Sequence, residues 1–329
     1  MENKKILLIS TSFFNYELKI KKELEAKGYD VYLFDDRISN STLDKLLVRF
    51  IPNLAKRKIN KHFQNILDSI EICDIDILLY IKPEAMPIWF LDKAKEANPK
   101  MKTIMYMFDS VKNYTKILDK ACHFDYKFTF DLKDAHSYGW GYRPLFYLEE
   151  FNGNYSDKQN LQTDFVMIGT LHSDRGIVLE KIRKQLDSNK NSKYFYLYVP
   201  VKIKKYIDLM IGKVKLANRK EIHTNSISLM ETSDILKSSR VVIDIHHRDQ
   251  NGLTMRTIES VGAKCKLITT NRNVLNEPFY HENNIQIIDR DNPVIDFEWV
   301  EKPYQFLDAN IYNYYTLSNF LETLIKGGS

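Results

Sequence analysis

A short segment after residue 250 combines residue types that suit a nucleoside diphosphate. Within Asn251–Gly262, Gly252 is predicted to open a helix whose first turns carry Arg256 and Glu259. The N–H groups at a helix start and an arginine side chain bind phosphate oxygens, and a carboxylate accepts hydrogen bonds from ribose hydroxyls. These residue types and their spacing therefore predict a nucleotide-binding site.

The elements on either side of this segment give it a defined place in a sheet. Val241–Ile245 is a predicted strand, residues 246–251 form a polar loop, and Lys266–Thr270 is the next predicted strand. This order puts the loop and the helix start at the carboxyl ends of parallel strands, where α/β proteins bind their ligands. Because Arg256 and Glu259 are three residues apart, a simple surface ion pair is the alternative interpretation.

The loop also contains a cluster that resembles a metal site. His246, His247 and Asp249 all have metal-ligand side chains. Adjacent histidines in one loop are poorly placed to bind the same ion, so we favour polar contacts to a ligand and predict no metal.

Composition narrows the class of protein. The chain has 329 residues, of which 44% are hydrophobic and 28% are charged, as is typical of a soluble globular protein with two domains. Its net charge of +5 is small, so we predict no nucleic-acid binding.

The three cysteines are far apart in the sequence, which favours a reducing compartment. The N-terminus is predicted to be a strand, not a signal peptide, and no run is apolar enough to span a membrane, so we expect a cytoplasmic protein.

Two halves of the chain repeat the same alternation of strand and helix. Runs that are apolar on both faces and separated by helices predict doubly wound parallel sheets. The predicted strands are 5–10, 29–34, 76–81, 102–108, 126–131 and 143–148, followed by 164–169, 194–199, 241–245, 266–270 and 285–289. A polar stretch at 149–163 is interpreted as a linker. We therefore predict an acceptor-binding domain at 1–150, a nucleotide-binding domain at 151–303 and a C-terminal helical segment at 304–329 that packs back on the first domain.

Four segments of the chain resemble a known protein family. Asp244–Glu259 resembles the donor-binding segment of GT-B glycosyltransferases, in particular the capsular or lipopolysaccharide biosynthesis group related to the CgeB-like enzymes. Tyr106–Asn113, Phe128–Ala135 and Pro144–Tyr147 are similar to the same group. The resemblance implies a GT-B fold, with two Rossmann-like domains that face each other across a cleft. It implies a metal-independent transfer of sugar from a nucleoside-diphosphate sugar, used as substrate without a further cofactor, to a free or lipid-linked saccharide.

The resemblance also implies which residues bind the nucleotide-sugar donor. Glu259 matches the second glutamate of the E-x7-E motif of retaining enzymes, whereas Asn251 stands at the first position and supplies no charge. The stereochemical outcome therefore stays open. The turn Gly169–Gly176 would face the donor phosphates, although a solvated turn is an equal alternative. The implied donor site consists of Gly169, Thr170, Arg175, His246, His247, Gly252, Leu253, Thr254, Arg256 and Glu259.

The acceptor side is predicted from the first half of the chain. Asp109 follows the strand 102–108 and is the first choice for the base that deprotonates the acceptor, with Asp131 and Asp134 behind it. Asp109 could instead cap the next turn. The other predicted acceptor residues are Phe13, Tyr16, Lys82 and Glu84.

Several alternatives remain open from the sequence. The basic segments Arg49–His62 and Lys202–Lys220 could bind the anionic inner face of a membrane, or could be ordinary solvated helix faces. The same fold could serve a sugar-nucleotide epimerase or a glycerol-phosphate transferase. The departures at Asn251 and in the first loop would also fit a module that binds a saccharide or a partner protein without catalysis.

Overall fold

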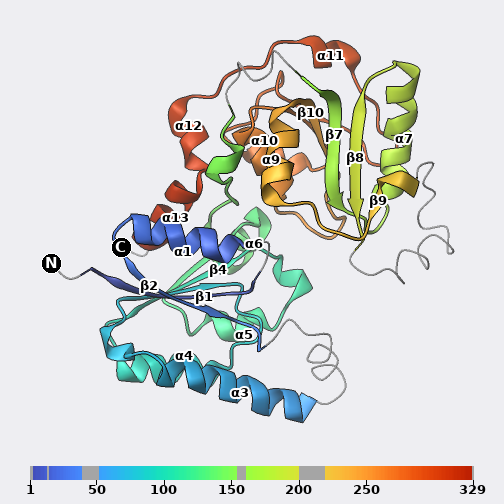
Figure 1. Cartoon of the computed structure of the whole chain (residues 1–329). Coiled ribbons are helices and arrows are strands. Elements are labelled where there is room, and N and C mark those ends of the chain that lie inside the picture. Colours follow the sequence, from blue (N-terminus) through green and yellow to red (C-terminus); the bar gives the residue numbers. More distant parts are fainter. Residues whose placement is uncertain (1–2, 13–14, 39–51, 154–160, 200–218, 328–329) are drawn as a thin grey trace. The chain divides into compact units, whose positions relative to one another are not determined.

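The computed structural model describes residues 3–12, 15–38, 52–153, 161–199 and 219–327 (Figure 1). The chain forms two compact units. Unit 1 consists of Met1–Pro144 and Ser318–Ser329, and unit 2 is Leu145–Leu317. The sequence predicted the corresponding boundaries after residues 150 and 303.

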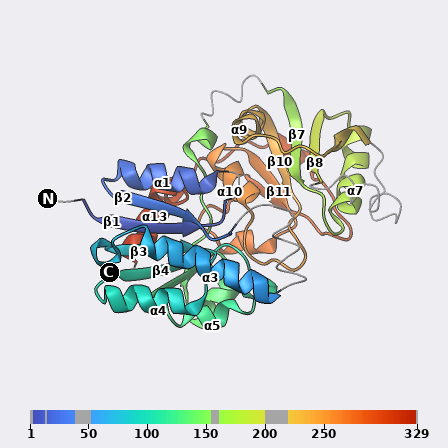
Figure 2. The ribbon, with the colours of Figure 1, turned by 60° about the horizontal axis from the view of Figure 1, so that its bottom comes forward.

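Unit 1 is built on a parallel sheet of six strands in the order β2-β1-β3-β4-β5-β6 (Figure 2). The strands are β1 (Lys5–Ser10), β2 (Asp30–Asp35), β3 (Ile77–Ile81), β4 (Lys102–Met107), β5 (Tyr126–Thr129) and β6 (Gly141–Tyr142). The central strands are apolar on both faces because helices cover both sides of the sheet.

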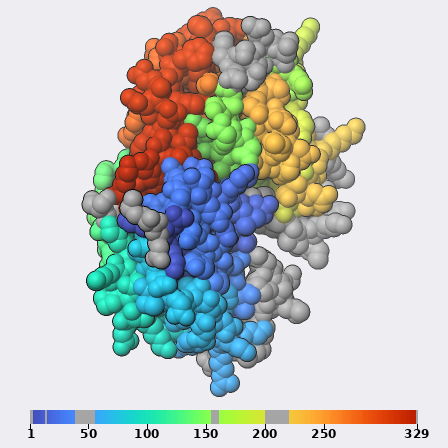
Figure 3. All heavy atoms as spheres, turned by 60° about the vertical axis from the view of Figure 1, so that its left-hand side comes forward, coloured from blue at the N-terminus to red at the C-terminus, as the bar shows by residue number. Residues whose placement is uncertain are grey.

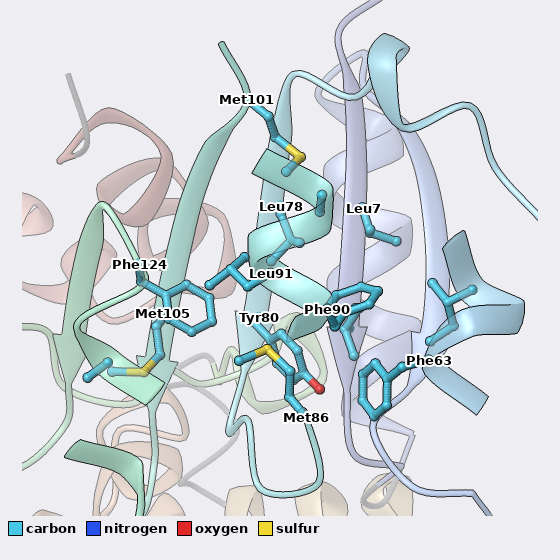
Figure 4. Close-up of a cluster of buried hydrophobic side chains, with 14 of the residues drawn as sticks. Leu7, Phe63, Leu78, Tyr80, Met86, Phe90, Leu91, Met101, Met105 and Phe124 are labelled. Atoms are coloured by element: carbon cyan, nitrogen blue, oxygen red, sulfur yellow. The ribbon is translucent and has the colours of Figure 1, made fainter. Parts of the chain in front are cut away.

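The helices of unit 1 form a layer on each face. They are α1 (Tyr16–Ala26), α3 (Pro52–Asp68), α4 (Ile88–Ala97), α5 (Ile117–Ala121), α6 (Leu132–Tyr138) and α13 (Leu317–Lys326), and the 3-10 helices are η1 (Ile72–Asp74) and η2 (Val111–Asn113). α3 and α4 cover one face of the sheet, and α1 and α13 lie on the other (Figure 1). Figure 4 shows Leu7 and Leu78 of the sheet facing Phe63 of α3 and Phe90 of α4, and all four are fully buried. Truncating one such side chain to alanine costs about 2–5 kcal/mol.

Unit 2 repeats this architecture with the strand order β12-β11-β10-β7-β8-β9, again all parallel. Its strands are β7 (Thr163–Thr170), β8 (Lys193–Tyr198), β9 (Ile222–His223), β10 (Ser239–Asp244), β11 (Lys266–Thr269) and β12 (Ile285–Ile287). Its helices are α7 (Arg175–Ser188), α9 (Leu229–Lys237), α10 (Met255–Gly262), α11 (Phe297–Glu301) and α12 (Ala309–Tyr314), with the 3-10 helices η3 (Glu149–Phe151), η5 (Arg219–Glu221) and η6 (Arg272–Asn276). α7 lies on one face of the sheet, and α9 and α10 lie on the other (Figure 1).

The two ends of the unit 2 chain segment meet within that unit. Tyr147 N donates to Tyr315 O at 2.8 Å, and Leu317 N donates to Tyr147 O at 3.1 Å. In the space-filling view, the red C-terminal residues of unit 2 accordingly lie beside its green first residues (Figure 3). Gly262 is also tightly packed there, since a Cβ on it would lie 2.6 Å from the Tyr147 ring.

The structure confirms the predicted pair of doubly wound parallel sheets and corrects three details. Residues 143–148 do not form the predicted strand: β6 ends at Tyr142, two residues before Pro144, which has no N–H for a sheet. The predicted helical segment 304–329 begins only at Ala309 and is interrupted, because α12 ends at Tyr314 and the fully buried Tyr315 precedes α13. α10 begins at Met255, not at Gly252, because Thr254 caps it.

No helix among the described residues is long and apolar enough to cross a membrane.

Candidate functional site

The strand order of unit 2 creates a switch point between β7 and β10. The chain passes from β7 outward to β8 and β9, then returns to the other side of β7 to form β10, β11 and β12. The chain therefore leaves β7 and β10 towards opposite sides of the sheet, and the carboxyl ends of two such strands are where doubly wound proteins bind ligands. Both predicted donor segments follow these two strands.

Arg175, the first residue of α7, joins the two sides of the switch point. Its Nε and Nη2 donate to Ile245 O at 2.8 and 2.5 Å, and its Nη1 donates to Thr170 O at 2.6 Å. The side chain is almost completely buried, and this burial lowers the pKa of the guanidinium to about 10. Arg175 thus holds together the chain segments that follow β7 and β10 and leaves a buried positive charge between them.

Gly169 permits this arrangement. A Cβ on Gly169 would lie 2.9 Å from Arg175 Nη1, closer than real Cβ contacts allow. The predicted donor residues Gly169, Thr170 and Arg175 therefore do come together. The hydrogen bonds that the structure shows for the Arg175 guanidinium go to main-chain carbonyls.

The start of α10 is fixed to the end of β10. Thr254 Oγ1 accepts a hydrogen bond from Thr257 N at 3.2 Å and donates to Asp244 Oδ2 at 2.7 Å. Thr257 Oγ1 donates to the same Asp244 oxygen at 2.7 Å. Because Asp244 is buried and ends β10, this network sets the direction in which the helix start points.

The loop before α10 is held from η6. Asn271 Nδ2 donates to the carbonyls of Asn251 at 3.2 Å and Gly252 at 3.3 Å, and Asn273 Nδ2 donates to Asn251 O at 2.7 Å. Leu253 is buried below the loop, and Asn251 is exposed. Gly252 therefore belongs to a braced loop that leads to the helix.

Arg256 and Glu259 form an ion pair on α10, with Arg256 Nη1 2.7 Å from Glu259 Oε2. The alternative of a surface pair is wrong, because the side chains are only 16% and 5% exposed. The two groups are not aligned for a hydrogen bond. Within the described part of the chain, the buried Nε and Nη1 of Arg256 have no hydrogen-bond acceptor. An unsatisfied buried donor costs about 1–3 kcal/mol, and a charged one costs more, which makes Arg256 a strong candidate for an anion contact.

Arg290, which the sequence analysis missed, joins the same edge from the loop after β12. It donates to Asp174 through Nε at 2.9 Å and Nη2 at 2.6 Å, and its buried Nη1 has no acceptor among the described residues. Hydrogen bonds from Arg290 hold the pKa of Asp174 well below its usual range, with help from Arg248 at 2.7 Å. The signal in the sequence is that Arg290 directly follows the predicted strand 285–289.

Three histidines lie at this edge. His246 Nδ1 is 2.7 Å from Thr270 Oγ1, and burial lowers its pKa to about 4, with further contributions from Arg290 and Arg175. Burial likewise lowers the pKa of His172 to about 3, and its ring centroid lies 4.9 Å from that of His247. His172 and His246 are therefore neutral hydrogen-bonding groups at neutral pH. No three metal-ligand side chains cluster in the described residues.

The carboxyl edge of the unit 1 sheet brings three predicted acceptor-side residues together. Lys82 Nζ lies 3.2 Å from Glu84 Oε1 and 3.3 Å from Asp109 Oδ2. Lys82 follows β3 with a φ of 56°, a left-handed conformation that lysine adopts rarely. Asp109 follows β4 and also accepts a hydrogen bond from Asn113 Nδ2 at 2.8 Å. Asp109 does not cap η2, whose N-cap is Ser110.

A buried network fixes the turn that carries Lys82 and Glu84. Asp36 accepts hydrogen bonds from Tyr80 Oη and from Ala85 N, the latter at 2.9 Å. Lys120 Nζ donates to Glu84 O at 2.5 Å. Burial raises the pKa of Asp36 and lowers that of Lys120 to about 8. The sequence analysis missed this network, because no local motif links residues so far apart in the chain.

The other residues predicted for the acceptor side do not join Lys82, Glu84 and Asp109 in the contacts that the structure shows. Asp131 is fully buried, caps α6 and accepts from Ser110 Oγ at 2.6 Å. Asp134 accepts from Val111 N at 2.7 Å. Tyr16 begins α1 and is partly buried. Phe13 lies outside the described residues.

Of the two predicted basic segments, the first lies in α3 from Pro52 onwards, and the second falls almost entirely outside the described residues. Residues 49–51 and 202–218 are not described, so the interpretation of these segments as a membrane-binding surface stays a prediction.

Comparisons with known proteins place the fold. No protein-family model and no curated protein matches the chain. Among solved structures, the chain is similar to HepE from Anabaena in complex with UDP and glucose, with 9% identity, a TM-score of 0.62 and 99% of both chains covered. A glycosyltransferase from Rickettsia africae matches with 12% identity and a TM-score of 0.63, over 100% of this chain and 98% of the other. UDP-GlcNAc 2-epimerase from Methanocaldococcus jannaschii matches with 11% identity and a TM-score of 0.55, over 98% and 100%. The chain therefore has a GT-B-like fold.

Proposed function

We propose that the chain is a glycosyltransferase that moves a sugar from a nucleoside-diphosphate sugar to a saccharide acceptor, free or lipid-linked, in the assembly of a surface polysaccharide such as capsule or lipopolysaccharide. The observation that carries the proposal is the pair of arginines, Arg256 and Arg290, at the carboxyl edge of the unit 2 sheet. Each has at least one buried N–H group for which the described residues supply no hydrogen-bond acceptor. The diphosphate of a donor would supply those acceptors. HepE, which shares the fold, is described in complex with UDP and with UDP-glucose.

The donor site uses several chemical features of unit 2. Arg256, Arg290 and the start of α10 bind the diphosphate and stabilise the charge that develops on it as it leaves. Glu259 accepts hydrogen bonds from the ribose, and exposed Asn251 contacts the donor sugar. His246 and His247 complete the polar wall near the phosphates. Buried Arg175 adds positive charge below the site while it holds the strand ends together.

The reaction is a direct displacement. The acceptor hydroxyl oxygen forms a bond to the anomeric carbon, and the bond between that carbon and the β-phosphate oxygen breaks. The electron pair of the broken bond leaves with the nucleoside diphosphate. Asp109 takes the proton of the acceptor hydroxyl, and Lys82 and Glu84 orient the acceptor beside it. Anomeric analysis of the product tests this step, since direct displacement inverts the anomeric configuration.

A thermal-shift screen tests the donor site. We expect at least one of UDP, GDP and dTDP to raise the melting temperature, because a ligand that binds only the folded state stabilises it. If no nucleoside diphosphate or nucleotide sugar changes the melting temperature, the proposed donor site is wrong.

An epimerase is the second candidate, because a UDP-GlcNAc 2-epimerase shares the fold over nearly the whole chain. Incubation with a nucleotide sugar in the absence of any acceptor separates the two reactions. An epimerase changes the sugar under these conditions, whereas a transferase needs the acceptor to form its product.

A further inference from the structure

A second positively charged site lies in unit 2 at the amino-terminal edge of its sheet, on the opposite side from the switch point. A cavity of about 230 Å³ opens there between the start of β11, the start of β10 and the segment after α11. Its lining includes four basic side chains, Arg240, Lys264, Lys266 and Lys302, and one carboxylate, Glu301. None of these residues has a part in the proposed sugar transfer.

The carboxylate in this cavity is already paired. Glu301 Oε1 lies 2.6 Å from Arg240 Nη1, so these two charges compensate each other. In the described part of the chain, no carboxylate forms an ion pair with Lys264, Lys266 or Lys302. Arg240 has a second carboxylate, Asp164 Oδ1, at 3.8 Å, so the three lysines are the cations of the lining for which the described residues form no ion pair.

Lys266 is the most informative of the three because it is buried, with only 5% of its surface exposed. Its Nζ donates to the carbonyls of Trp299 at 2.5 Å and Val300 at 3.2 Å and lies 4.6 Å from the Trp299 ring centroid. An ammonium group has three donors, so one N–H remains for a ligand. Burial lowers the pKa of Lys266 to about 8, and the nearby carboxylates of Glu301 and Asp296 offset this effect only in part.

The other two lysines extend the site towards solvent. Lys264 lies in the turn between α10 and β11 with a φ of 52°, and its Nζ is 4.9 Å from the Tyr312 ring centroid. Lys302 directly follows α11 and is exposed. Tyr304, whose side chain carries a hydroxyl group, also lines the cavity.

We propose that this cavity binds a small phosphate-type anion, either inorganic phosphate or a small phosphomonoester. Three lysines with no acidic partner and a tyrosine hydroxyl match the charge and the several acceptor oxygens of a phosphate group. The cavity is smaller than the usual 300–1,000 Å³ of drug-sized ligand pockets, which favours a compact ligand.

Lys264→Asn with Lys302→Gln tests the site without removing the buried lysine. Asparagine tolerates the left-handed conformation at 264, so the turn keeps its shape while the charge is lost. Lys190→Asn is the matched control, because Lys190 is an exposed lysine with a φ of 55° in the turn before β8, outside the cavity. Arg256→Gln reports phosphate that binds at the donor edge instead.

The probe is inorganic phosphate, compared with sodium chloride at equal ionic strength. We expect phosphate to raise the melting temperature of the wild type, Lys190→Asn and Arg256→Gln by about 2 °C or more at saturation. In the Lys264→Asn/Lys302→Gln variant, the Kd for phosphate by calorimetry should rise at least about tenfold. Should this double variant fail to fold, the exposed Lys302→Gln change alone should still weaken phosphate binding.

Four results would overturn the proposal. The wild type could show no response to phosphate beyond that to chloride. The double variant could keep the wild-type Kd, or Arg256→Gln could abolish binding, which would place the phosphate at the donor edge. Binding to phosphatidylglycerol vesicles without any binding of free phosphate would identify a lipid-facing patch in place of a small-anion site.

Discussion

The carboxyl edges of the two sheets have the same architecture but differ in the burial and the hydrogen bonding of their cations. In unit 1, Lys82 lies between Glu84 and Asp109, so its charge is compensated by neighbouring side chains. In unit 2, Arg256 and Arg290 retain buried donors that no described residue satisfies. An edge whose cation lies between two carboxylates suits a neutral polar ligand such as a saccharide. An edge whose ion-paired arginines keep buried N–H groups without an acceptor suits an anion, which can accept hydrogen bonds from them. The fold alone does not distinguish the two roles, but the buried N–H groups without an acceptor do.

The largest effect is expected on the rate of sugar transfer, from a substitution at the carboxyl edge of the unit 1 sheet. Asp109→Asn should lower kcat by about a hundredfold or more, because the acceptor hydroxyl loses its base. The Kd for the nucleoside diphosphate should not change. Asp92→Asn on α4 is the control and should keep the wild-type kcat. An Asp109→Asn enzyme with normal turnover would remove Asp109 from the mechanism.

The next effect concerns anion binding at the unit 2 edge. Arg256→Gln should raise the Kd for the nucleoside diphosphate by about tenfold to a hundredfold, because a charge-assisted hydrogen bond to phosphate is lost. Calorimetric titration measures this change. Arg272→Gln, an exposed change on η6, and Lys82→Gln in unit 1 should each leave this Kd within about twofold. If Lys82→Gln weakens the nucleotide more than Arg256→Gln, the assignment of the two edges is reversed.

The close packing of Gly169 against Arg175 predicts a loss of stability. Gly169→Ala should lower the free energy of unfolding by about 1–3 kcal/mol, because the added Cβ crowds the guanidinium. Urea unfolding measures the change. In an Arg175→Met background the same substitution should cost less, and strictly additive effects would show that the contact is not the cause.

The strands and the switch point of unit 2 show which features could be predicted from the sequence and which could not. The strands were predictable because both of their faces are buried, and the residues at the switch point were predictable because polar residues directly follow those strands. Arg290 obeys the same rule after β12 and was within reach. The capping of α10 by Thr254 is also local, since it joins Thr254 to Thr257, and was within reach. The hydrogen bonds of Arg175 to Ile245 O and the Asp36–Tyr80 contact depend on segments that are distant in sequence. No local pattern predicts such contacts.

The last prediction is a pH dependence of the free energy of unfolding that arises from His246 in unit 2. The folded-state pKa of His246 is about 4, below its ordinary value of 6.5, so the unfolded chain binds the proton more readily. The stability that this histidine contributes is complete above about pH 6.5 and is lost as the pH falls towards 4. Between about pH 8 and pH 5, the free energy of unfolding should fall by about 2 kcal/mol through His246.

Urea unfolding of His246→Gln at these two pH values measures this contribution. The variant should lose about 2 kcal/mol less than the wild type over the same interval. His136→Gln, which changes an exposed histidine of α6 in unit 1, should keep the wild-type pH dependence. Identical pH dependence in His246→Gln and the wild type would contradict burial of a neutral imidazole at the unit 2 edge.

Calorimetric titration with nucleoside diphosphates is the most direct test of the contrast between the two edges. We predict that UDP, GDP or dTDP binds the wild-type chain with one site per chain, that Lys82→Gln binds it equally well, and that Arg256→Gln binds it at least about tenfold more weakly. The absence of binding by all three nucleotides, or equal affinity of the wild type and Arg256→Gln, would contradict the assignment of the unit 2 edge to the donor.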